Sequence, residues 1–188
     1  MRWKCLAAGF FAGAAVIFIA GLVGVSGWVL GSYAFAGKGL MIVPLLVLPY
    51  LFFAGWTIAL RSGALPRDLV FFAAGVHLGV GSPGLLMGDI AVLLFTGVLL
   101  VDGIAVVAAA GLWWARHAAP RTLLIWLVVV WILAFVLVAI YHLVLAVTAG
   151  AAVAYVERRP ARTPLVAGGL AIAVLIMAIV PITATPPV

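Results

Sequence analysis

Charged side chains are scarce in this sequence. They make up 7% of its 188 positions, whereas 69% are hydrophobic, and the mean hydropathy is +1.44. Soluble domains are about 25% charged, and so little polar surface cannot keep a globule in water. We therefore expect a multi-pass protein of the cell membrane, folded as a single domain over residues 1–188 and covered largely by lipid.

Asparagine and glutamine are both absent, and cysteine occurs once. Hyperthermophile proteins tend to avoid the heat-labile amides, which predicts a thermophilic source. The single cysteine, Cys5, excludes an internal disulfide and any CxxC redox or zinc motif, so no metal site is expected.

Catalytic motifs are missing as well. The chain has no HExxH, no GxSxG, no Gly-rich phosphate loop and only four acidic residues. Hydrolysis and phosphoryl transfer need positioned acids and bases, so we expect no catalytic activity of the chain's own. The ten Lys and Arg residues form short clusters between apolar runs, a pattern typical of membrane topology and not of a nucleic-acid partner.

Six apolar segments divide the chain. They predict an all-α bundle of five or six membrane-crossing helices, six being preferred, with a cytoplasmic N-terminus. The third segment is interrupted at Gly81–Gly84, so it is either a broken span or a half-helix that turns back. The expected helices are Cys5–Leu30, Leu40–Leu60, Leu69–Gly88, Ile90–Ala115, Thr122–Val156 and Pro164–Ile182.

The segment Thr122–Val156 is too long for one perpendicular span. As a single helix its 35 residues measure about 52 Å, against a hydrocarbon core of about 30 Å. Two crossings would leave one residue for the turn, and no Gly, Pro, Asn or Asp lies between Thr122 and Thr148. We therefore expect mostly one long helix that tilts or protrudes toward a partner.

The distribution of positive charge gives a different answer for this segment. Six spans place six Lys and Arg residues inside and four outside, and five spans place seven inside and three outside. If Thr122–Val156 crossed twice, only Lys38 would lie outside. Charge favours that arrangement and geometry opposes it, so six spans remains the working topology.

Small residues at helical spacing predict two close helix contacts. Gly9 and Gly13 form a GxxxG pattern in the first segment, and Ala146, Gly150 and Ala154 recur every four residues in the fifth. Such faces let a second backbone approach closely. We expect another helix, or another subunit, to cover each of them.

Two ionisable residues, His77 and Asp102, lie near the middle of apolar segments. A carboxylate at the bilayer centre costs about 2.5–3.5 kcal/mol on insertion scales, so it is rarely incidental. His77 precedes Asp89 by 12 residues and Asp102 follows it by 13. A turn at Gly88–Ile90 would place the two level, within hydrogen-bonding or water-bridged reach. Such a pair is either a proton, ion or cofactor site or a structural link between helices.

A third histidine, His142, raises a cofactor alternative. A b-type haem held by His77 and His142 would follow a common arrangement of axial ligands on membrane helices. In the six-span topology the two residues lie at different depths, whereas five spans bring both near the cytoplasmic side. An interfacial His142 is preferred.

Three functions are compatible with these features. The preferred one is a non-catalytic helical subunit of a larger membrane complex, whose partners are other subunits or copies of itself. The first alternative is a small proton-coupled transporter or channel that uses Asp102 and His77. The second is an electron-transfer subunit that binds haem or quinone through His77 and His142.

Overall fold

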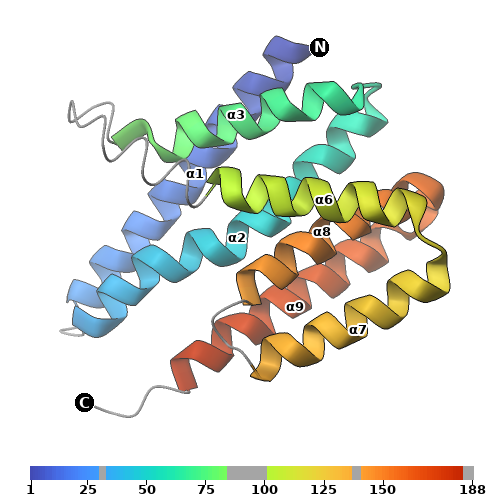
Figure 1. Cartoon of the computed structure of the whole chain (residues 1–188). Helices are drawn as coiled ribbons and strands as arrows, with labels where there is room; N and C mark the ends of the chain where they lie inside the picture. Colours follow the sequence, from blue (N-terminus) through green and yellow to red (C-terminus); the bar gives the residue numbers. More distant parts are fainter. Residues whose placement is uncertain (30–32, 84–100, 137–140, 184–188) are drawn as a thin grey trace.

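The computed structural model describes residues 1–29, 33–83, 101–136 and 141–183, and all regular elements among them are helical (Figure 1). This confirms the all-α prediction for the described part of the chain. In order, the elements are α1 (Arg2–Val29), α2 (Tyr33–Arg61), η1 (Pro66–Asp68), α3 (Leu69–Val80), α6 (Gly103–His117), α7 (Pro120–Val136), α8 (Tyr141–Arg158), η4 (Pro160–Arg162) and α9 (Thr163–Thr183).

Several helix boundaries differ from the sequence-based expectation, most clearly those of the second and third helices. The second helix begins at Tyr33 and not at Leu40, so Lys38 lies within α2 and not in a loop. The third helix ends at Val80, directly before the predicted interruption, and the next described helix begins at Gly103. The expected turn at Gly88–Ile90 falls outside the described residues.

The prediction of one long helix over Thr122–Val156 is wrong. The segment forms two helices, α7 and α8, which fold back on each other. Trp131 of α7 donates a hydrogen bond from Nε1 to Thr148 Oγ1 of α8 at 3.1 Å. In one straight helix these residues would be about 25 Å apart. The two helices fit because α7 already begins at Pro120 and α8 continues to Arg158.

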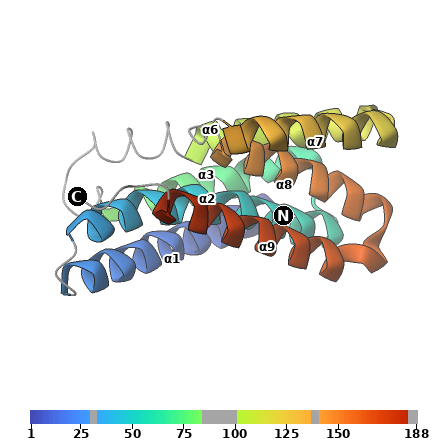
Figure 2. The ribbon, with the colours of Figure 1, turned by 90° about the horizontal axis from the view of Figure 1, so that it is seen from below.

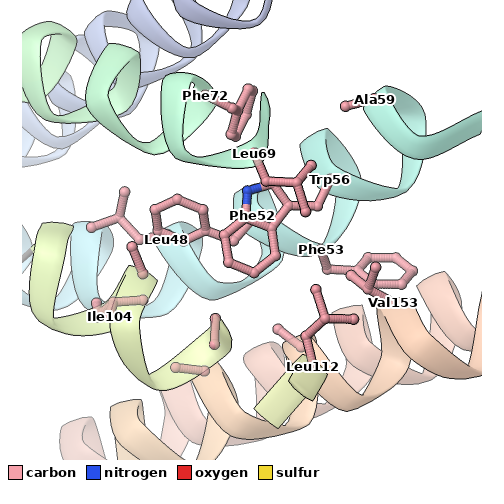
Figure 3. Packing of buried hydrophobic residues seen from close by; sticks show 14 of the residues in the cluster. Leu48, Phe52, Phe53, Trp56, Ala59, Leu69, Phe72, Ile104, Leu112 and Val153 are labelled. Carbon is pink, nitrogen blue, oxygen red and sulfur yellow. The ribbon is translucent and has the colours of Figure 1, made fainter. Parts of the chain in front are cut away.

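Helix α2 occupies the centre of the packing. It contacts α1 and α3 on one side and α6, α8 and α9 on the other, an arrangement that the two ribbon views show together (Figures 1 and 2). Its buried side chains Phe52 and Trp56 meet residues of α3, α6 and α8 in the main apolar core (Figure 3). Because α2 links the two groups of helices, its position determines how α3 and α6 face each other.

Glycines provide the closest helix contacts. A Cβ atom at Gly9 or Gly13 of α1 would meet backbone atoms of α3, and one at Gly75 or Gly79 of α3 would meet backbone atoms of α1. Glycine on both sides lets the two backbones touch, a type of packing that is frequent between membrane helices. The covering of Gly9 and Gly13 by another helix is as expected.

A second close crossing joins α6 and α8. Ala146 and Ala154 are buried, and a Cβ at Gly150 would meet the carbonyl oxygen of Ala108. A Cβ at Gly111 of α6 would likewise meet backbone atoms of Val147 in α8. The small-residue face of α8 is therefore covered by α6 of the same chain, so the chain itself supplies the partner that the sequence analysis left open.

Most of the positive charge gathers at one end of the helices. Two hydrogen bonds and an ion pair connect the helices at this end: Arg61 donates to Pro160 O at 2.7 Å, Arg158 donates to Arg116 O at 2.7 Å, and Arg2 forms an ion pair with Asp68 at 3.5 Å. Lys38 lies 23 residues before Arg61 on α2, which is about 34 Å along that helix. The residues that form what we call the basic end are Arg2, Lys4, Arg61, Arg67, Arg116, Arg121, Arg158, Arg159 and Arg162.

Two of the described helices contain segments long and apolar enough to cross a membrane, Arg2–Val23 and Pro44–Arg61. Shorter apolar stretches occupy Arg121–Ile132 and Pro160–Ile176. Helix length and composition thus support association with a membrane. They do not confirm five or six spans, and the number of crossings stays a prediction.

Candidate functional site

His77 and Asp102 lie in direct contact. His77 is on the last turn of α3, Asp102 directly precedes α6, and the distance from His77 Nδ1 to Asp102 Oδ2 is 2.9 Å. The contact expected from the sequence is therefore present, although α3 ends before the turn from which it was inferred. By helical rise the pair lies roughly 12–21 Å from the basic end, measured along α3 and α6.

The pair is open to its surroundings on one side. The side chain of Asp102 is 42% exposed and that of His77 is 17% exposed. Val101 and Asp102 adopt π-helical backbone geometry where α6 begins, and such local widening of a helix is frequent at functional sites. A purely structural link would be enclosed by protein. The exposed part of Asp102 instead faces the space beside the pair.

That space is a cleft of about 670 Å³ between α3 and α6, which we call the α3–α6 cleft. Its walls are mainly apolar, and it extends from the His77–Asp102 pair to Arg116 and His117 at the basic end. Pockets for small molecules in proteins have this size and this mixture of apolar walls and few polar groups. The lining residues are Trp56, Pro66, Leu69, Val70, Ala73, Ala74, His77, Leu78, Asp102, Ala105, Val106, Ala109, Leu112, Trp113, Arg116 and His117.

The charges at the mouth of the α3–α6 cleft are balanced. Arg116 forms two hydrogen bonds with Glu157 of α8, Nε to Oε2 at 3.0 Å and Nη2 to Oε1 at 2.6 Å. His117 Nδ1 lies 2.7 Å from the carbonyl oxygen of Trp113. A carbonyl only accepts, so His117 Nδ1 carries the proton in this contact. The mouth therefore contributes little net charge to the cleft.

Trp56 lines the cleft from α2, although the sequence did not predict it as a site residue. The residue is 3% exposed, and its indole N–H has no hydrogen-bond partner among the described residues. Figure 3 shows it among Phe52, Phe72 and Leu69. Nothing in the sequence distinguishes Trp56 from the other tryptophans, because its place depends on how α2 lies under α3 and α6.

His142 does not share the α3–α6 cleft with His77. It lies half-buried in the first turn of α8, and it is not among the residues that line the α3–α6 cleft. His77 already directs Nδ1 to Asp102. The described residues thus form no bis-histidine arrangement around a shared space, and they hold no cluster of three or more His, Cys, Asp or Glu residues suited to a metal ion.

The His77–Asp102 arrangement is chemically suited to holding a proton. When Asp102 is ionised it accepts the Nδ1 hydrogen of His77, which leaves Nε2 as the basic nitrogen. An added proton then converts the pair from a net charge of −1 to neutral. Comparison with models of known families, with curated proteins and with solved structures finds no match to this chain, so function is argued from this geometry alone.

Proposed function

We propose that the chain crosses the membrane seven times with its basic end in the cytoplasm. Helices α1, α3, α7 and α9 lead away from that end, and α2, α6 and α8 lead back to it. Nine cationic residues then lie inside and Lys38 alone outside, the distribution that the positive-inside rule favours. Large apolar side chains exposed on the outside of the helices support a lipid environment; among them are Phe11, Phe18, Leu124, Ile125, Trp126, Ile172 and Leu175.

Cysteine labelling tests this topology at the α7–α8 hairpin. In a Cys5→Ser background, single cysteines replace Arg121, Arg159 or Lys38, and intact cells receive a membrane-impermeant maleimide. We expect Lys38→Cys to be labelled from outside, and Arg121→Cys and Arg159→Cys only after the cells are opened. If Arg121→Cys and Arg159→Cys react from opposite sides, the segment between them crosses an odd number of times and the proposed topology is wrong.

We further propose that the protein is a small proton-coupled transporter of amphiphilic molecules, which bind in the α3–α6 cleft. The observation that carries this proposal is the contact of His77 with Asp102 at the inner end of the cleft. Ionisable residues inside membrane helices usually mark ion or substrate pathways. Here the pair is accessible from a cavity of ligand size, so a proton and a ligand reach the same place.

The function preferred from the sequence was a non-catalytic subunit of a larger membrane complex, and two of the features behind that preference have an explanation within the chain. That hypothesis rested partly on an over-long fifth helix, which is a hairpin, and partly on small-residue faces that needed a partner. Helix α3 covers Gly9 and Gly13, and α6 covers Gly150. Helices of the same chain thus cover these faces, for which the sequence predicted either another helix or another subunit.

Dye flux into proteoliposomes tests the transport proposal. Vesicles with an imposed pH gradient receive ethidium, anilinonaphthalene sulfonate or Nile red, which are cationic, anionic and neutral amphiphiles. We expect the flux of at least one dye to follow the pH gradient and Asp102→Asn to abolish that dependence, because the amide removes the negative charge that stabilises a proton on His77. Asp68→Asn is the matched control, since Asp68 is a buried carboxylate outside the cleft. Gradient-independent flux of all three dyes would rule the proposal out.

A further inference from the structure

The charge inside the α3–α6 cleft is asymmetric along its length. Its titratable or charged lining residues, among the residues described, are His77, Asp102, Arg116 and His117. Arg116 is neutralised by the two hydrogen bonds to Glu157. The remaining charged group is Asp102 at the inner end, and among the described residues the imidazole of His77 is its only ionisable partner on the cleft wall.

The free-energy cost of a buried negative charge means that Asp102 requires a positive charge nearby. An ionised Asp102 beside a neutral His77 carries one negative charge in a site that lies at membrane depth. Burying an uncompensated charge in a low-dielectric environment is expensive, and one positive charge nearby removes most of the cost. A proton on the pair supplies that charge. A cationic ligand beside the exposed part of Asp102 supplies it equally well.

The aromatic residues of the cleft suit a cation and not an anion. Trp56 and Trp113 both line the cleft, and tryptophan is the side chain whose ring face attracts cations most strongly. The ring of His117 lies 4.9 Å from that of Trp113, centroid to centroid, so a second ring lines the cleft near the basic end. An anionic ligand would meet the Asp102 carboxylate at the inner end, while Arg116 is already occupied.

On these grounds we propose that the ligand is a lipophilic cation, and that one cation and one proton exclude each other at the His77–Asp102 pair. This inference rests on the proposed transport function and specifies its substrate class. Binding of the cation sends the proton of the pair into water, and rebinding of the proton releases the cation. With both bound the site would carry a net charge of +1, and with neither −1, so the neutral states dominate.

Binding of two matched probes to the purified protein tests the proposal. Tetraphenylphosphonium and tetraphenylborate have nearly the same size and shape and opposite charge. We expect tetraphenylphosphonium to bind with a Kd that rises about tenfold for each pH unit below the protonation midpoint of the pair, and to release one proton per ion bound in weakly buffered solution. Tetraphenylborate should bind at least about tenfold more weakly and release no proton.

Variants separate the site from general adsorption. Asp102→Asn should abolish proton release and weaken tetraphenylphosphonium binding, whereas Asp68→Asn should retain both. Because the pH dependence is measured on the unaltered protein, the test stands even if Asp102→Asn fails to fold. A pH-independent Kd for tetraphenylphosphonium, or tighter binding of tetraphenylborate, would overturn the inference. Proton-driven flux of a neutral or anionic dye would still support transport, so the two proposals fail separately.

Discussion

Gly150→Leu is expected to prevent α6 and α8 from packing and to destabilise the folded protein by about 3 kcal/mol. An added Cβ at Gly150 would meet the Ala108 carbonyl oxygen and the Leu112 nitrogen, which are backbone atoms. A flexible side chain could turn away, but a backbone moves only if the whole helix moves. The damage should therefore reach α2, which packs against α8.

The measurement is thermal unfolding in detergent, followed by the loss of the monodisperse peak on size-exclusion chromatography. Gly168→Leu on α9 is the matched control, because a Cβ at Gly168 meets nothing within 4 Å. Gly150→Ala should fall between the parent and Gly150→Leu. If Gly150→Leu unfolds at the temperature of the parent, the close contact between α6 and α8 does not exist.

Ala109→Trp is expected to block the α3–α6 cleft without changing its ionisable groups. Ala109 is an exposed residue on the cleft wall of α6, so the indole can enter the open space without displacing the core. We expect tetraphenylphosphonium binding and dye flux to fall at least about tenfold, equivalent to about 1.4 kcal/mol of binding free energy.

The control for this prediction is the neighbouring position. Ala110 is exposed as well but does not line the cleft, and adjacent residues of a helix point about 100° apart. Ala110→Trp should bind and transport like the parent. Equal losses in Ala109→Trp and Ala110→Trp, or no loss in either, would show that the ligand does not occupy the cleft.

The contact between His77 and Asp102 could be predicted from the sequence because the two apolar segments contain few ionisable residues. Both lie in apolar segments that also contain no Lys or Arg, so each was the other's only suitable neighbour on an adjoining segment. The cost of an isolated carboxylate in lipid then predicts the pairing. The cleft beside the pair could not be anticipated, because it results from the way α2 separates α3 from α6.

The hairpin of α7 and α8 was missed because helix boundaries were drawn at the limits of the uncharged run. The absence of Gly, Pro, Asn and Asp between Thr122 and Thr148 indicates an unbroken helix, whereas the positive charges indicate a hairpin. Pro120 at the start of α7 is a favoured helix-opening residue, and α8 continues beyond Val156 to Arg158. The count of positive charges favoured two passes for this segment, and a hairpin of α7 and α8 is consistent with that count.

The one-sided placement of cations also bears on biogenesis. Under the proposed topology, the only basic side chain that must be translocated during synthesis is Lys38, and the connection between α7 and α8, residues 137–140, has the uncharged sequence Leu-Val-Ala-Ile. Both helices of this hairpin can therefore enter the bilayer together as an apolar unit, while the arginines that flank it stay on the ribosome's side. Insertion of the α7–α8 hairpin then requires no Lys or Arg side chain to pass through the lipid.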